Sequence, residues 1–122
     1  MVVWRYNLFL GKEVRVFLKG QAQESFLELK KRKDRESIQI IKSVERIIEI
    51  LKYNPQYGDP IKKELIPREF KDEGIKNVYR AELSNYWRML YTIEGSRIDI
   101  LVFILTISDH PEYDQLLGYR KK

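Results

Sequence analysis

The spacing of apolar and polar positions predicts one strand and two helices in the first half of the chain. Residues 13–18 alternate between the two kinds of side chain, as a strand with one buried face does. Residues 21–32 and 36–52 repeat apolar positions every three or four residues, as amphipathic helices do. Asp34 is a candidate N-cap for the second helix, and an Asn-Pro pair ends it. The expected buried positions are Val14, Val16 and Leu18 on the strand, Ala22, Phe26 and Leu29 on the first helix, and Ile38, Ile41, Val44, Ile48 and Leu51 on the second.

Three apolar-rich stretches in the second half of the chain predict an antiparallel meander. They are separated by a Ser-Asn pair and a Gly-Ser pair, which are residue types that favour tight turns. Short connections of this kind join neighbouring antiparallel strands. The predicted strands are residues 77–83, 86–94 and 97–107.

The alternation within the first two of these strands also predicts how they pair. A three-residue loop would place Glu82 opposite Arg88 and Arg80 opposite Leu90, so that the apolar sides of the two strands coincide. A two-residue loop would instead place Glu82 opposite Trp87 and mix the faces. We therefore expect the three-residue loop, with both arginines on one face of the sheet.

The last predicted strand is apolar on both faces. The side that it turns toward the arginines is expected to carry Leu101, Phe103, Leu105 and Ile107. Contiguous apolar surface beside charged side chains is typical of an interaction site. We therefore expect a partner or a ligand to cover this strip.

These elements together predict a single α+β domain over residues 1–122. An N-terminal helical hairpin is expected to pack on one face of a small, twisted, mainly antiparallel sheet. Residues 1–12 are interpreted as an extra strand or an arm, and residues 53–75, rich in proline, as a connecting loop. Residues 108–122 are interpreted as a C-terminal tail.

Composition narrows the setting more than it narrows the function. The chain has no cysteine, no apolar window of about 18 residues and no signal-peptide pattern, which favours a cytoplasmic protein without a membrane span. Its net charge of +5 modestly favours a polyanionic partner. Phosphate-loop, dinucleotide and Ser-His-Asp patterns are absent from the sequence, so no cofactor is expected.

The one histidine of the chain, His110, follows the last strand, between acidic residues. Histidine is the side chain most often used for proton transfer near neutral pH, although a histidine that only caps a turn is as common there. Asp109, Glu112 and Asp114 surround it with ligands for a hard metal ion. A second acidic cluster to complete such a site is missing from the sequence, and we expect no metal.

The order of these elements and several short motifs resemble the RelE/ParE toxin superfamily. The segment NYWRMLYTIEG is similar to the family's middle-strand signature, and YNPQYGDPIKKEL is similar to its helix-ending Asn-Pro and the loop that follows. The C-terminal strand, followed by Asp-His and a tyrosine, resembles the family's ending. The resemblance covers roughly residues 13–119. It implies the toxin of a type II toxin–antitoxin pair.

In the RelE branch the resemblance implies a metal-independent endoribonuclease that cleaves mRNA on the ribosome by attack of the 2′-hydroxyl. Arg88 would hold the scissile phosphate, Arg80 would add a second cation, and His110 would transfer a proton. Tyr113 matches a family tyrosine, and Glu82 could act as the base. The structural alternatives are a surface pairing of Arg88 with Glu82, and a Tyr113 that only packs the tail onto the sheet.

The resemblance also implies partners. An acidic antitoxin would bind the strip of Leu101, Phe103 and Leu105, as part of a heterotetramer or beside a toxin homodimer. Two other functions stay open: a ParE-like inhibitor of gyrase, and an inactive member that only binds a protein. The expected phosphate contacts to mRNA are Lys62, Lys63, Arg120, Lys121 and Lys122.

Overall fold

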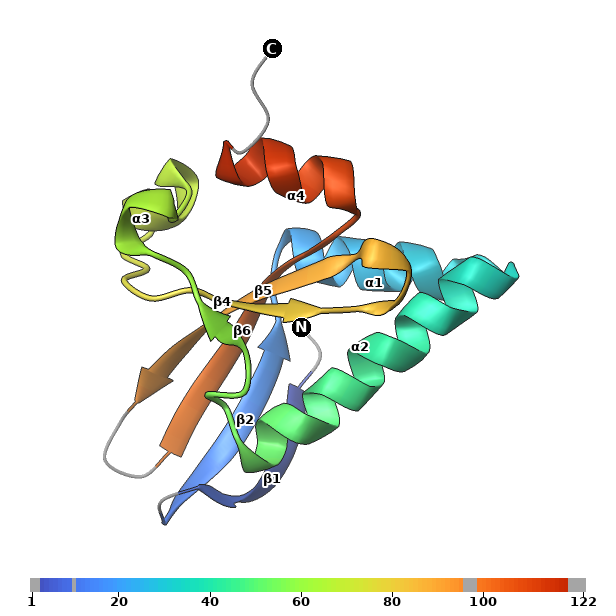
Figure 1. Ribbon diagram of the computed structural model, residues 1–122. Helices are drawn as coiled ribbons and strands as arrows, with labels where there is room; N and C mark the ends of the chain where they lie inside the picture. The colour runs from blue at the N-terminus through green and yellow to red at the C-terminus, as the bar shows by residue number, and fades with distance from the viewer. Residues whose placement is uncertain (1–2, 10, 96–98, 119–122) are drawn as a thin grey trace.

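The computed structural model describes residues 3–9, 11–95 and 99–118, and only the backbone of residues 3–8. The fold is α+β, as predicted, with a mixed sheet between two pairs of helices (Figure 1). The elements are β1 (Val3–Phe9), β2 (Lys12–Leu18), α1 (Gln21–Lys31), α2 (Arg35–Tyr53), β3 (Asp59–Pro60), η1 (Lys63–Leu65), α3 (Arg68–Asp72), β4 (Tyr79–Glu82), η2 (Ser84–Tyr86), β5 (Arg88–Gly95), β6 (Asp99–Ser108) and α4 (His110–Leu117).

The sheet has the strand order β1-β2-β6-β5-β4-β3, and only the pair β2/β6 is parallel. The predicted meander is confirmed as β4, β5 and β6. Its first register is confirmed as well, because Glu82 pairs with Arg88 and Arg80 pairs with Leu90. Because of this register, both arginines share one face of the sheet. The stretch expected to be a strand or an arm contains β1, which forms one edge of the sheet.

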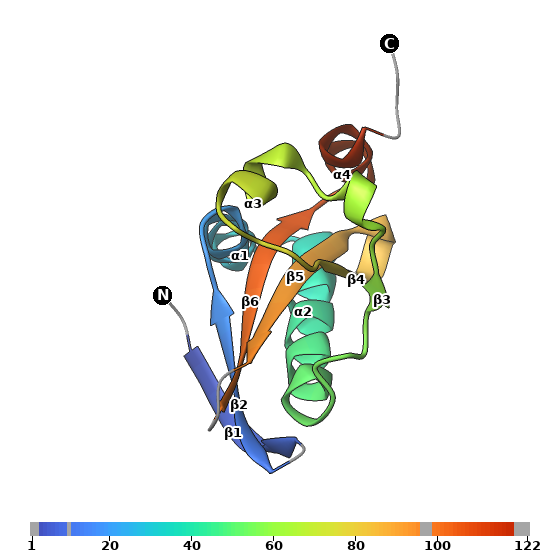
Figure 2. The same cartoon turned by 90° about the vertical axis from the view of Figure 1, so that its left-hand side faces the viewer.

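Helices α1 and α2 cover the other face of the sheet (Figure 2). The carboxylate of Asp34 caps α2 by accepting hydrogen bonds from the backbone N–H and the hydroxyl of Ser37, at 3.0 and 2.8 Å. These bonds hold the pKa of Asp34 below its ordinary value. The predicted buried positions are confirmed except for Ile38, which is 43% exposed; Ile40 and Ile47 are buried instead. The stripe of α2 is therefore broader than predicted, as is usual for a helix that packs on a sheet.

Helices α3 and α4 pack on the arginine face and bury a second, smaller core there. Residues 53–75 are thus not an open loop, since they contain β3, η1 and α3. The expected tail likewise begins with a capped helix, in which the carboxylate of Asp109 accepts a hydrogen bond from the backbone N–H of Glu112 (3.0 Å). The residues of this core are Ile66, Phe70, Val78, Leu90, Leu105, Tyr113 and Leu117.

A β-bulge changes which side chains of β6 face the arginines. The register of β5 and β6 shifts between Leu90 and Tyr91, which leaves Leu105 as an extra residue in β6. A bulge of this kind exchanges the two faces for every residue beyond it. Ile107 therefore packs in the core under α1 and α2, and the prediction that it lies on the arginine face is wrong. Thr106 takes its place on that face, opposite Leu90.

The buried hydroxyl of Tyr91 ties the segment after α2 to the sheet. It accepts a hydrogen bond from the backbone N–H of Gly58 (2.8 Å) and donates one to the backbone carbonyl of Pro55 (2.9 Å). Burial raises the pKa of Tyr91 above its ordinary value. The same contact brings Asp59 beside Arg80, because β3 begins directly after Gly58. The position of one acid near the arginine face therefore depends on this buried tyrosine.

Replacement of Gly58 by alanine is expected to destabilise the fold. The new Cβ would lie 2.7 Å from the carbonyl oxygen of Arg80 and 2.8 Å from the hydroxyl of Tyr91, which is closer than real contacts allow. Overpacking of this kind costs about 1–3 kcal/mol, which would appear as a lower midpoint in urea unfolding. Gly95→Ala is the matched control, since its Cβ would meet nothing within 4 Å. Equal midpoints for the two variants would contradict this account of the segment.

Candidate functional site

Two rows of side chains cross the arginine face of the sheet, running from β4 through β5 to β6. They follow from the confirmed register of β4 with β5 and the observed register of β5 with β6, since residues directly opposite each other share a face. Each row joins an arginine to a hydroxyl group at the end of β6. The rows are Arg80, Leu90 and Thr106, and then Glu82, Arg88 and Ser108.

Tyr113 of α4 lies against both arginines. Its ring centroid is 5.5 Å from the Cζ of Arg88, a cation–π distance. The nearby hydroxyl of Tyr113, and after it the carboxylate of Asp59, hold the pKa of Arg80 above its ordinary value. Asp59 accepts from Nη2 of Arg80 at 3.3 Å. The side chain of Tyr113 is 2% exposed, so it is both a packing residue and the link between the two cations.

Several buried donors on this face have no hydrogen-bond partner among the described residues. They are the Nε atoms of Arg80 and Arg88 and the hydroxyls of Thr106 and Ser108. Native proteins pair most buried polar groups, and the exceptions gather at functional sites. The guanidinium of Arg88 is held from its other end, because its Nη1 donates to the backbone carbonyl of Tyr86 (3.0 Å). The unpartnered atoms themselves are inaccessible, so what this face can offer to an anion is the positive charge of the two partly exposed guanidinium groups.

His110 is the first residue of α4 and lies one turn before Tyr113, which joins Arg80 and Arg88 in what we call the cluster. Its Nε2 is 3.3 Å from Oδ2 of Asp114, and its side chain is 48% exposed. It precedes Tyr113 by three positions, so the two side chains lie on the same stripe of the helix. His110 is therefore accessible to solvent, and Asp114 is placed to orient its ring.

Glu82 does not act as the counter-ion that the sequence suggests. It is exposed and lies opposite Arg88, yet no ion pair joins the two among the described residues. The acid that pairs with an arginine here is Asp59, which the sequence analysis missed. The two-residue strand that carries Asp59 has no periodicity, so only its pairing with β4 reveals it.

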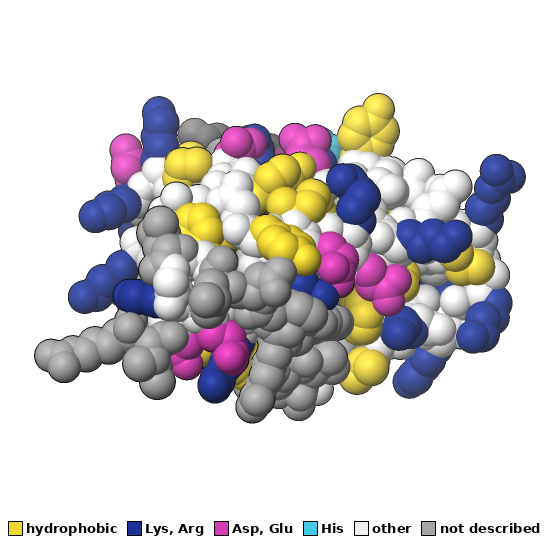
Figure 3. Space-filling view, turned by 90° about the horizontal axis from the view of Figure 1, so that it is seen from below, with side chains coloured by type: hydrophobic (Ala, Val, Ile, Leu, Met, Phe, Trp, Pro, Cys, Tyr) yellow, Lys and Arg dark blue, Asp and Glu magenta, His cyan; other side chains and the backbone are white. Residues whose placement is uncertain are grey.

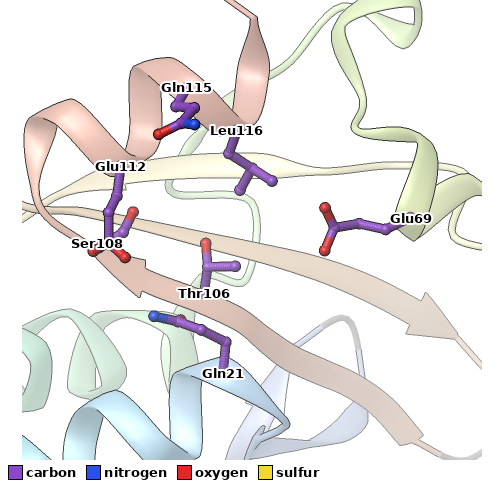
Figure 4. Close-up of a pocket in the computed structure, with 7 residues that line it drawn as sticks. All are labelled: Gln21, Glu69, Thr106, Ser108, Glu112, Gln115 and Leu116. Carbon is purple, nitrogen blue, oxygen red and sulfur yellow. The ribbon is translucent and has the colours of Figure 1, made fainter.

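A hollow of about 440 Å³ opens beside the cluster, between α1, α3, α4 and the end of β6 (Figure 4). Glu69 and Glu112 enter it from α3 and α4, and Thr106 lies on its floor. On its α1 side, the side-chain amide of Gln21 pairs with the backbone of Ile107 as a neighbouring strand would. It donates to the carbonyl of Ile107 (3.0 Å) and accepts from its N–H (2.9 Å). The lining of this hollow carries two carboxylates and no cation, which disfavours the binding of an anion in it.

The other predicted contact residues are spread over the surface. Lys62 and Lys63 are exposed around η1, and the predicted basic residues 120–122 lie outside the described residues. Lysine and arginine side chains gather at the right-hand end of Figure 3, where α1 meets α2. The exposed basic residues of that turn are Lys30, Lys31, Arg32, Lys33 and Arg35. The sequence analysis did not select this cluster, although five basic residues among six are visible in the sequence.

The apolar strip predicted to bind an antitoxin is only partly available. Leu101 and Phe103 are half-buried, and Phe103 stacks on Phe17 with ring centroids 5.1 Å apart. Leu105 is 6% exposed beneath α3 and α4, so the prediction that a partner must cover it is wrong. The chain itself covers that end of the strip.

Three further observations concern metal binding, membrane spans and similarity to known proteins. Within the described ranges, no group of three or more histidine, cysteine or acidic side chains is placed to hold a metal ion. In the same ranges, none of the helices has the length and apolarity to cross a bilayer. Neither a family model, nor a curated protein, nor a solved structure matches the chain. The function must therefore be argued from the arginine face.

Proposed function

We propose that this protein is a metal-independent endoribonuclease with a RelE-like fold, the toxin of a toxin–antitoxin pair that cleaves mRNA on the ribosome. The observation that carries the proposal is the meeting of Arg80 and Arg88 on Tyr113, with His110 three positions away on the same helix. RNA cleavage without a metal needs fixed cations at the phosphate and groups that move protons. The arginine face has both kinds of group.

In the proposed reaction, the 2′-oxygen of a nucleotide attacks its own phosphorus and the bond from phosphorus to the 5′-oxygen breaks. The planar fork of Arg88 would hold the phosphate oxygens, and Arg80 would stabilise the added negative charge. Glu82, exposed across the strand pair from Arg88, would accept the proton of the 2′-hydroxyl. His110 would give a proton to the leaving 5′-oxygen. The products are a 2′,3′-cyclic phosphate and a 5′-hydroxyl.

The proposed antitoxin is an acidic protein that binds this protein at Leu101 and Phe103. Lys19 adds positive charge there, since its Nζ lies 5.6 Å from the ring centroid of Phe103. A partner with carboxylates beside apolar side chains would complement this end of β6. Coexpression with the product of a neighbouring acidic reading frame would test the pairing.

The first experiment is induction of the chain in a bacterial host, with growth measured and the ends of its transcripts mapped. The proposal predicts growth arrest, with cuts at fixed codon positions in translated messages only. Arrest with intact transcripts and blocked supercoiling would favour a gyrase inhibitor. Normal growth with intact transcripts would leave a protein that only binds a partner. Either of the last two results contradicts the ribonuclease.

His110→Ala is expected to lower the cleavage rate by about 10²-fold, the usual contribution of a general acid. The change should not unfold the protein, because the side chain is half exposed and is not part of either core. Rates would be measured on programmed ribosomes with folded protein, as judged by circular dichroism. Glu45→Ala, an exposed change on α2, is the matched control. An unchanged rate in His110→Ala would exclude it from proton transfer.

A further inference from the structure

The turn between β4 and β5 holds two consecutive residues in the left-handed region. The φ angles are 60° at Asn85 and 64° at Tyr86, and these are the only described residues other than glycine with positive φ. The turn is closed by a hydrogen bond from the N–H of Trp87 to the carbonyl of Ser84 (3.2 Å). Turns of this shape favour Asn-Gly, because a side chain at the second position is strained. Tyr86 therefore occupies a position where glycine would be more stable.

The strained conformation is imposed by contacts that do not use the side chain of Tyr86. The backbone N–H of Ser84 donates to the hydroxyl of Ser43 (3.1 Å), and the amide of Asn85 donates to Oε1 of Gln39 (3.2 Å). Both partners lie on α2, which anchors the turn to the helix layer. A residue kept in strain at an ordered position commonly has a functional reason.

The side chain of Tyr86 is the most exposed large apolar side chain among the described residues, at 78%. Its own backbone carbonyl accepts the hydrogen bond from Arg88, so the residue that carries the ring is adjacent to the arginine face. The hollow of about 560 Å³ between this turn and α2 is lined by Lys42 and Arg46 and by no acidic residue. The turn that carries the exposed ring therefore has cations on both sides, Arg88 at the carbonyl of Tyr86 and Lys42 with Arg46 beside Ser84 and Asn85.

We propose that Tyr86 is a stacking platform for a base of single-stranded RNA, next to the phosphate that Arg88 holds. This inference rests on the proposed function and adds a substrate-binding residue to it. Exposed aromatic rings between cations are the usual means of binding single strands, because every base offers a flat face and every linkage a charge. An RNA strand would run from Arg88 across Tyr86 toward Lys42 and Arg46. The left-handed backbone holds the ring out from the surface for this contact.

The test compares Tyr86→Gly, Tyr86→Phe and the wild type. Binding of a fluorescein-labelled RNA of about 12 nucleotides would be followed by anisotropy at low salt. Tyr86→Gly is expected to bind roughly tenfold more weakly, a typical loss for one stacked base, while its melting temperature rises because the strain is removed. Tyr86→Phe should bind as the wild type does. Tyr53→Ala, at an exposed tyrosine at the end of α2, is the control and should change neither value.

The platform would be overturned by a wild type that binds no RNA or by a Tyr86→Gly variant that binds RNA unchanged. A Tyr86→Gly variant that melts at a lower temperature would overturn it as well, since that would show a structural role. Loss of binding to an acidic peptide, with RNA binding unchanged, would also overturn it by marking a protein contact. Weakened RNA binding in a protein that cuts no transcripts would keep the platform and remove the ribonuclease. Transcript cutting that the Tyr86→Gly change leaves unaffected would keep the ribonuclease and overturn the platform.

Discussion

Arg88→Ala is expected to lower mRNA cleavage by about 10²- to 10³-fold, the usual loss when one donor to a developing oxyanion is removed. Arg88 has the best placement for this role. Its guanidinium is held by the carbonyl of Tyr86 at 3.0 Å and by the ring of Tyr113, and its Nε is unpaired among the described residues. The measurement is the single-turnover rate on programmed ribosomes at saturating protein.

Two further variants make this result specific. Arg88→Lys keeps the charge but loses the planar fork, so it should recover only part of the rate. Arg15→Ala, which removes a surface arginine paired with Glu13 on β2, should leave the rate unchanged. Cleavage by Arg88→Ala at the wild-type rate would show that the scissile phosphate does not bind on this face. Equal losses in Arg88→Ala and Arg15→Ala, with the rate retained in Arg88→Lys, would point instead to a general need for positive charge.

Tyr91→Phe is expected to be the most destabilising single change that we consider, at about 2–4 kcal/mol. It removes one oxygen, and this leaves the N–H of Gly58 and the carbonyl of Pro55 buried without their partner. Each such group costs about 1–3 kcal/mol. Urea unfolding would measure the loss. Tyr79→Phe is the matched control, because Tyr79 stacks on Tyr91 at 5.4 Å but its hydroxyl has no hydrogen-bond partner among the described residues.

The pH dependence of the same pair of proteins gives an independent check. Burial raises the pKa of Tyr91 in the folded state, so the neutral hydroxyl stabilises the fold at every pH below the unfolded value of about 10. As pH rises past that value, this contribution falls by up to about 1.4 kcal/mol per unit. The stability gap between wild type and Tyr91→Phe should therefore narrow above about pH 10. A gap that stays constant would show that the hydroxyl is not buried as described.

Loss of the Tyr91 hydroxyl is also expected to disturb the pairing of Asp59 with Arg80 on the arginine face. The segment that Tyr91 holds continues into β3, where Asp59 pairs with Arg80. The stability of the fold and the position of Asp59 beside Arg80 are thus linked by a short stretch of chain. The link explains why a residue in the core under α1 and α2 bears on groups at the opposite face of the sheet.

The sequence by itself determined α1 and α2, the meander and the register of β4 with β5. These features follow from local spacing, because a side chain's burial repeats with the period of the element that carries it. Arg80 and Arg88 were placed on one face for this reason, before any tertiary contact was known. The spacing failed at Ile38 and Ile107. In the first case the packed stripe is broader than the pattern suggests, and in the second a bulge reverses the faces of β6.

Only the tertiary structure decided what meets the arginines. Tyr113 reaches them because α4 folds back over the sheet, and Asp59 reaches Arg80 because Tyr91 holds the preceding segment. Tyr86 became a candidate only when its backbone angle was known. Contacts of this kind join residues about 20 or more positions apart, and their free energy comes from packing and hydrogen bonds that no local period records. The sequence therefore determined the sheet's meander and the helical layer of α1 and α2, and the packing of α4 and of the segment after α2 decided the other layer and the candidate site.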